Sequence, residues 1–128
     1  MSEVSMQKLI LGRKGEDIAV EYLKSKGYEL ITRNYNVSRW GELDAVMRDG
    51  NYLVFVEVRT KSNTFFGTPL ETIDAEKRRQ IVKMARYYMA REKIPENMFC
   101  RFDVVGIVLS SDDKPQIEYY KDAFIAGD

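Results

Sequence analysis

Carboxylates and cations interrupt an otherwise apolar stretch, WGELDAVMRDGNYLVFVEVRTK, in residues 40–61. The charged residues that argue for chemistry there are Glu42, Asp44, Glu57, Arg59 and Lys61. Burying an unpaired charge costs several kcal/mol, so their presence needs a reason. Carboxylates that lie close together bind hard divalent cations such as Mg²⁺ or Mn²⁺. A metal-bound water can attack a phosphodiester, and a neighbouring side-chain cation can stabilise the phosphate charge.

The same stretch predicts a β-hairpin that would bring the acids together. Asp49-Gly50 is a strong turn signal, and we place it at the centre of the turn. Glu42 then opposes Glu57, and Asp44 is a diagonal neighbour of Glu57, about 7–8 Å away at the backbone.

Alternation along the two strands places all five charged side chains on one face of the hairpin. Residues 53–56 are apolar on both faces, which is typical of a central strand. The alternative is an exposed face on which the acids pair with Arg59 and Lys61, an arrangement that contributes little stability. A further acid, Glu16, shares a helix face with an apolar stripe. Glu16 either joins the site or is a first-turn glutamate that is stabilised by the positive N-terminal end of the helix dipole.

The composition excludes several kinds of site. The chain contains no histidine and a single cysteine, Cys100, which excludes histidine-dependent catalysis, cysteine zinc clusters and an internal disulfide. A length of 128 residues and a hydrophobic fraction of 45% predict one domain, residues 1–128. The sequence has no long apolar run and no secretory signal. We therefore expect a cytoplasmic protein without a membrane partner.

Positive charge is concentrated in one predicted helix, although the chain has 20 basic and 20 acidic residues and no net charge. Residues 77–93 contain seven basic residues and one acid. The candidate nucleic-acid contacts are Lys77, Arg79, Lys83 and Arg86. The last three recur on one helix face, whereas Lys77 lies on another. This basic stripe predicts either contact with a phosphate backbone or a solvated helix face.

Hydrophobic periodicity and turn residues predict elements in the order α-β-β-β-α-β-β. The helices are expected at about residues 7–25 and 75–92, the second with Asp74 as its N-cap. The strands are expected at about residues 28–35, 43–47, 52–59, 102–109 and 116–120. A strand-helix-strand passage indicates a crossover, and hence an α/β fold with a mixed β-sheet flanked by helices. Gly12 and Gly15 either allow close packing of the first helix or delay its start.

Two further features leave alternatives open. Phe65 and Phe66 either stack on bases or pack against the sheet. Asp103 lies among valines in a predicted strand, where it either supports the site or forms a structural ion pair, for example with Arg101.

Four segments, in this order, strongly resemble the YraN family of uncharacterised bacterial proteins: GRKGEDIAVEYL, RNYNVSRWGELDAV, FVEVRTK and RFDVVGIV. The resemblance covers about residues 11–108. That family is placed by fold among the restriction-endonuclease-like PD-(D/E)XK nucleases, near the archaeal-type Holliday-junction resolvases. The resemblance therefore implies a restriction-endonuclease-like fold, a Mg²⁺ cofactor and cleavage of phosphodiesters. It also implies DNA as the partner and a homodimer, because junction resolvases cut two strands symmetrically.

Carried over by position, the resemblance implies a role for each charged residue of the site. Asp44 matches the strand Asp, Glu57 the motif acid and Glu16 the helix Glu, all three as metal ligands. Arg59 stands where the motif lysine usually stands, and the residue before Asp44 is leucine instead of the nominal proline. Arginine stays protonated, so Arg59 can hold a phosphate but cannot be a general base. Lys61 shares that face and could supply the amine.

Three functions follow from these observations. The first is a metal-dependent DNA endonuclease that acts on branched or recombination intermediates. The second is a non-catalytic nucleic-acid-binding module with the same fold, which Arg59 in the lysine position favours. The third is a protein-interaction domain, which the zero net charge allows.

Overall fold

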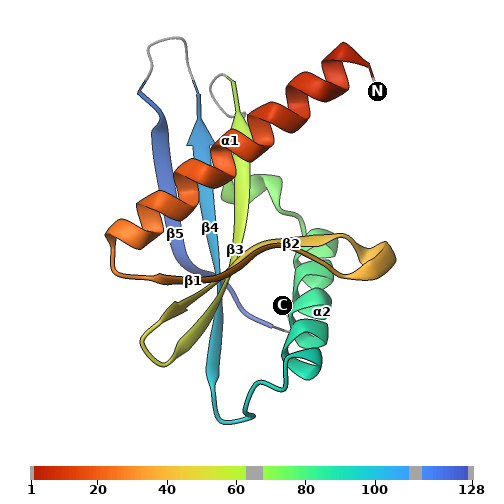
Figure 1. Ribbon diagram of the computed structural model, residues 1–128, viewed down its shortest axis with the longest axis vertical. Helices are drawn as coiled ribbons and strands as arrows, with labels where there is room; N and C mark the ends of the chain where they lie inside the picture. The colour runs from red at the N-terminus through yellow and green to blue at the C-terminus, as the bar shows by residue number, and fades with distance from the viewer. Residues whose placement is uncertain (1, 63–67, 110–113, 127–128) are drawn as a thin grey trace.

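The computed structural model describes residues 2–62, 68–109 and 114–126 (Figure 1). The predicted contacts of Phe65 and Phe66 lie outside these residues. Along the chain the elements are α1 (Glu3–Ser25), β1 (Glu29–Asn36), the 3₁₀ helix η1 (Ser38–Trp40), β2 (Glu42–Asp49), β3 (Tyr52–Lys61), the 3₁₀ helix η2 (Leu70–Thr72), α2 (Ala75–Arg91), β4 (Phe99–Val108) and β5 (Gln116–Phe124). Apart from the two 3₁₀ helices, the order is the predicted α-β-β-β-α-β-β.

The strands form a five-stranded sheet in the order β1-β2-β3-β4-β5. β3 and β4 are parallel, whereas the other neighbouring pairs are antiparallel. Parallel neighbours need a crossover connection, and α2 lies within the connection between β3 and β4. The prediction of a mixed sheet flanked by helices is confirmed.

The two long helices cover opposite faces of the sheet. Ala19 and Leu23 of α1 pack in one core cluster with Val54 of β3. Ile81 of α2 packs in a second cluster with Phe55 of β3. Successive side chains of a strand point to opposite faces, so these clusters lie on the two sides of the sheet. β3 is therefore buried from both sides, as its apolar sequence predicts.

Side-chain caps set the beginnings of both helices. The Asp74 carboxylate accepts a hydrogen bond from the backbone N–H of Lys77 at 2.8 Å, which confirms the predicted N-cap of α2. α1 begins at Glu3, before the predicted start near residue 7, because the Ser2 hydroxyl accepts a hydrogen bond from the N–H of Ser5 at 3.1 Å. No helix in the described part of the chain combines the length and the apolar character needed to cross a membrane.

The register of the β2–β3 hairpin differs from the predicted one. Asp49 pairs with Tyr52, so the two-residue loop is Gly50-Asn51 instead of Asp49-Gly50. Gly50 has a φ of +58°, a left-handed conformation that glycine adopts without steric cost. Moving the turn by one position shifts the pairing by two residues. A shift of two keeps the alternation, because the side-chain period of a strand is two, and Val46 still shares a face with Phe55. Leu43 departs from the alternation, since it packs in the same cluster as Val46.

The corrected register changes the neighbours of the predicted acids. Asp44 now falls opposite Glu57 instead of diagonal to it, at the position after the last described pair of the ladder. Glu42 was predicted to oppose Glu57, and that prediction is wrong. Glu42 lies exposed at the beginning of β2, where it pairs with Asn36 of β1.

A buried ionic cluster lies on β4. Arg101 is 5% exposed and Asp103 is fully buried, and Nε of Arg101 lies 3.1 Å from Oδ1 of Asp103. Asp103 also accepts hydrogen bonds from the Tyr119 hydroxyl and from the backbone N–H of Asp122. A second contact joins Nη1 of Arg101 to Oδ2 of Asp49 at 2.7 Å. Of the two alternatives for Asp103, the structural ion pair is the one found.

Candidate active site

Asp44 and Glu57 meet where the β2–β3 ladder ends; we call them the carboxylate pair. The last described pair of the ladder is Ala45 with Val56, and the two acids follow it on either strand. Asp44 is half-buried, and Glu57 is only 8% exposed. Oδ2 of Asp44 accepts a hydrogen bond from the backbone N–H of Val58 at 2.8 Å. The two carboxyl groups lie close enough for each to shift the pKa of the other.

The members of the carboxylate pair resist being ionised together. Burial and then the negative charge of Glu57 raise the pKa of Asp44 well above its usual value. Burial also raises the pKa of Glu57, although the positive charges of Lys77 and Arg59 oppose this shift. A proton kept by one of the two carboxyl groups relieves their mutual repulsion. A divalent cation between them would relieve the same repulsion.

The donor set at this position consists of hard oxygen atoms. Among residues 2–62, 68–109 and 114–126, no group of three or more His, Cys, Asp or Glu side chains is placed to hold a metal ion. A metal at the carboxylate pair would therefore take two side-chain oxygens and complete its shell with backbone carbonyls and water. Such a set fits Mg²⁺ or Mn²⁺ better than a softer metal. The metal itself stays a prediction.

Gly15 brings α1 directly against β3 and so positions the next residue, Glu16. A Cβ atom at Gly15 would lie 1.9 Å from Oγ1 and 2.8 Å from Cβ of Thr60. Every residue other than glycine would therefore push the helix away from the strand. Of the two alternatives for the α1 glycines, Gly15 shows the close packing.

Replacing Gly15 by alanine tests this contact. We expect Gly15→Ala to lower the free energy of unfolding by about 1–3 kcal/mol, because the added methyl group overpacks the helix–strand contact. Gly12 is the matched control, since a Cβ atom there meets nothing within 4 Å. Gly12→Ala should raise the free energy of unfolding by about 0.5–1 kcal/mol through its helix propensity. Urea denaturation measures both, and equal effects of the two substitutions would contradict the packing role.

Glu16 is held by side chains of β1 and of its own helix. Its Oε1 accepts a hydrogen bond from Nδ2 of Asn34 at 3.0 Å. Nη1 of Arg13 lies 3.5 Å away, and Nη2 of Arg33 lies 3.8 Å away. The negative charge of Glu16 adds to the raised pKa of both members of the carboxylate pair, so it acts on them electrostatically.

Sequence reasoning missed the residues that hold Glu16. Asn34 has a φ of +51°, and asparagine tolerates this left-handed region better than most residues. Nothing local in the sequence connects Asn34 with a helix residue 18 positions earlier. The contact arises only when α1 packs across the sheet.

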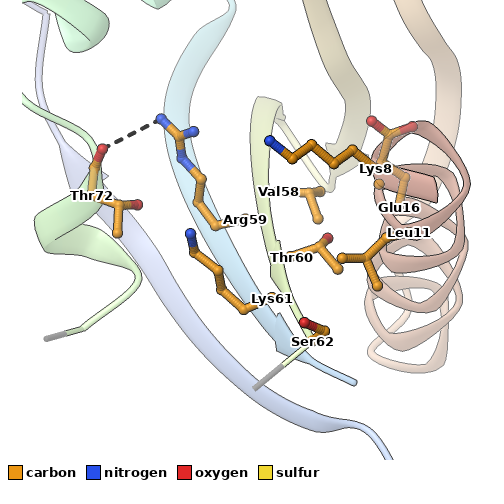
Figure 2. Close-up of a pocket in the computed structure, with 10 residues that line it drawn as sticks. Lys8, Leu11, Glu16, Val58, Arg59, Thr60, Lys61, Ser62 and Thr72 are labelled. Atoms are coloured by element: carbon orange, nitrogen blue, oxygen red, sulfur yellow. Dashed lines mark hydrogen bonds between the residues drawn. The ribbon is translucent and has the colours of Figure 1, made fainter. Parts of the chain in front are cut away.

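Arg59 and Lys61 extend from the end of β3 toward η2 (Figure 2). Arg59 is half-buried, and its Nη2 donates a long hydrogen bond of 3.5 Å to the carbonyl of Thr72. Its Nε is buried and has no hydrogen-bond partner among the described residues. Lys61 is exposed. Arg59 is thus a cation with a spare donor close to the carboxylate pair, whose Glu57 responds to its charge.

A cleft of about 600 Å³ adjoins these residues (Figure 2). α1 lines one side with Lys8, Leu11, Gly12 and Glu16, while the end of β3 and Thr72 line the other. The β2–β3 ladder ends at Val56, so the edge of β3 beyond that residue has no described strand partner on the β2 side. The cleft follows this open edge.

The four candidate nucleic-acid contacts do not form one surface. Arg79, Lys83 and Arg86 are exposed on α2, whereas Lys77 is half-buried and lowers the pKa of Glu57 through its charge. Nζ of Lys83 lies 4.1 Å from the centre of the Trp40 ring. The exposed side chains of Arg79, Lys83 and Arg86 are accessible to a partner. Lys77 instead lies near the carboxylate pair, where its charge acts on Glu57.

Comparisons with known proteins place the chain among close relatives. The sequence model of the uncharacterised protein family UPF0102 matches residues 15–107. A UPF0102 protein of Legionella pneumophila is 43% identical over 116 residues, which cover 91% of this chain and 95% of the relative. A UPF0102 protein of Rhodococcus opacus is also 43% identical, over 91% of this chain and 97% of its own length. A UPF0102 protein of Lachnoclostridium phytofermentans is 41% identical, over 94% of this chain and 98% of its own length.

Proposed function

The chain belongs to the uncharacterised protein family UPF0102, the YraN family that its motifs resemble, and we propose that it is a metal-dependent DNA endonuclease. The observation that carries the proposal is the carboxylate pair, half-buried Asp44 and buried Glu57, with the Arg59 guanidinium close enough for its charge to act on Glu57. Metal-assisted phosphodiester hydrolysis requires oxygen donors that hold the metal and a cation that stabilises the phosphate charge. The carboxylate pair and Arg59 can supply these two parts.

Each residue has a distinct task in this proposal. Asp44 and Glu57 hold Mg²⁺ or Mn²⁺, and Glu16 adds negative charge from the α1 side. When bound, the metal supplies an acidic water and a positive charge at the scissile phosphate. Arg59, which is half-buried, binds a phosphate oxygen through its guanidinium group, and exposed Lys61 contacts the same strand. Arg59 stays protonated and therefore orients the phosphate without exchanging protons.

The proposed substrate is branched or recombination DNA, with flanking duplex held along α2. Arg79, Lys83 and Arg86 are exposed on that helix and can follow a phosphate backbone. A homodimer belongs to the same proposal, because symmetric cleavage of a junction needs two active sites.

A non-catalytic nucleic-acid-binding module is the second candidate. The observation that favours it is Arg59 itself, which cannot activate a nucleophile as a neutral amine can. The module would use the same cations to bind DNA and would not turn it over.

Cleavage of a labelled four-way junction and of a matching linear duplex tests the two candidates. Incubation with Mg²⁺ and with Mn²⁺ should give metal-dependent cutting, and the ratio of junction to duplex products reports the substrate class. Binding of both substrates without cutting under either metal would reject the endonuclease and leave the module.

Metal affinity is expected to depend on pH. Carboxylates bind a metal only when deprotonated, and the pKa of Asp44 is raised well above its usual 3.8. Mn²⁺ affinity should therefore be full at alkaline pH and fall as the pH drops through the raised pKa, while an ordinary exposed aspartate would still be ionised. Calorimetric titration from below the usual aspartate pKa to alkaline pH measures this dependence. An affinity that follows the titration of an ordinary exposed aspartate would show that the pair is not the ligand.

A further inference from the structure

We propose that the cleft between α1 and β3 binds one unpaired nucleic-acid strand, and that Lys8 of α1 holds its backbone opposite Arg59 and Lys61. The inference rests on the proposed function for the position of the scissile bond, but it concerns binding and is testable without cleavage. It adds Lys8 to the residues of the site and assigns the substrate strand a single-stranded state.

The walls of the cleft come from elements of different kinds. The open edge of β3 forms its floor, since the ladder with β2 ends at Val56. α1 stands along one side, and Thr72 of η2 lies on the other (Figure 2). At Gly15 the helix contacts Thr60, which is one of the lining residues of the cleft.

Cations line both sides of this cleft. Lys8 is exposed and extends from α1 toward the end of β3 (Figure 2). Arg59 and Lys61 lie across from it, and the Nε–H of Arg59 has no hydrogen-bond partner among the described residues. Glu16 is the acid that lines the cleft, and its oxygen already accepts from Asn34. Two walls of positive charge fit the phosphates of a strand that runs between them.

The size of the cleft selects one strand. A volume of about 600 Å³ lies within the range of roughly 300–1,000 Å³ of pockets that enclose a nucleotide-sized ligand. The cleft is bounded by α1 on one side and by Thr72 of η2 on the other, so it offers room for one strand between these walls and little for a second.

The helix extends the same surface beyond the cleft. Val4, Lys8 and Leu11 recur at intervals of four and three residues, which places them on one face of α1. Val4 is 61% exposed and Leu11 is half-buried. On this face Lys8 can contact a phosphate of a single strand, while Val4 and Leu11 on either side can contact its unpaired bases.

Fluorescence anisotropy in EDTA tests the inference with labelled single-stranded DNA, single-stranded RNA and duplex DNA of equal length. Lys8→Ala should weaken single-strand binding about three- to tenfold and reduce the slope of log K against log salt by about 0.7, as expected for one lost phosphate contact. Duplex binding should change less than twofold. The matched control is Lys14→Ala, an exposed lysine of the same helix that does not line the cleft.

The binding results for the two lysine variants decide the inference, and the cleavage result decides the endonuclease proposal. A larger loss for Lys8→Ala than for Lys14→Ala, confined to single strands, supports the inference, and the DNA and RNA arms identify the nucleic acid. Equal losses for the two variants, equal losses for duplex and single strand, or no single-strand binding by the wild type would overturn it. Failure of the wild type to cut in Mg²⁺ or Mn²⁺ rejects the endonuclease and leaves the binding result standing.

Discussion

Asp44→Asn is expected to lower kcat/KM for cleavage on the order of 10³-fold or more while leaving the fold intact. Asparagine has nearly the same shape, and its carbonyl oxygen can still accept the hydrogen bond from Val58. What it removes is the charge that, in the proposed function, holds a metal together with Glu57. This variant should therefore lose cleavage activity while keeping its free energy of unfolding.

The effect on stability should even be favourable at high pH. The pKa of Asp44 is raised in the folded protein, so the group stabilises the fold fully below its unfolded pKa and loses that contribution as the pH rises through the folded pKa. Metal-free wild type should become less stable over that interval. Asp44→Asn lacks the titrating group, and its free energy of unfolding should vary less with pH.

Cleavage rates and urea denaturation in EDTA across the pH range measure the two effects. Asp17→Asn, a change at an exposed carboxylate of α1 outside the carboxylate pair, serves as the control. An Asp44→Asn variant that cuts at the wild-type rate would remove Asp44 from the catalytic site. A variant that fails to fold would show that the carboxylate is structural.

Asp103→Ala should give the largest loss of stability, about 3–5 kcal/mol. The substitution leaves the guanidinium of Arg101 buried with one remaining carboxylate, Asp49. It also removes the acceptor of the Tyr119 hydroxyl and of the Asp122 N–H. Unpaired buried donors carry the full cost of their lost hydration.

The ion pair between Asp17 and Arg33 offers an exposed control. Its N–O distance of 2.7 Å is shorter than the 3.1 Å between Arg101 and Asp103, but the Asp17 side chain is 64% exposed. Asp17→Ala should cost less than about 1 kcal/mol, because water screens an exposed pair. Urea denaturation compares the two variants. Similar losses would mean that burial does not decide the strength of these pairs.

The sequence predicted the carboxylate pair in spite of a wrong register, and the reason is geometric. The predicted turn was displaced by one position, so the strands slipped by two residues, and two is the side-chain period of a strand. Asp44 and Glu57 therefore stayed on one face and became closer. Glu42 did not keep its predicted partner, since that depended on the register itself.

Contacts between distant segments could not be predicted. The partners of Glu16 on β1, the charge of Lys77 beside Glu57 and the cleft itself all depend on how α1 and α2 settle on the sheet. Periodicity identifies which face of a helix is buried, but not which side chain of the sheet it meets. Gly15 could be recognised as a point of close approach, because a glycine within a helix indicates one. Nothing in the sequence identified Thr60 as the residue that it contacts.

The parallel pairing of β3 with β4 has a consequence for how the chain folds. β1, β2 and β3 join through short antiparallel connections, which close at little entropic cost and form within microseconds in isolated hairpins. β4 can add to β3 only after the whole segment that contains α2 has folded back. The hairpin that contains the carboxylate pair should thus be an early part of the folding pathway, and the Arg101–Asp103 cluster a late one. The mutual repulsion of the two acids then acts on the chain before α2 and β4 have packed against the hairpin.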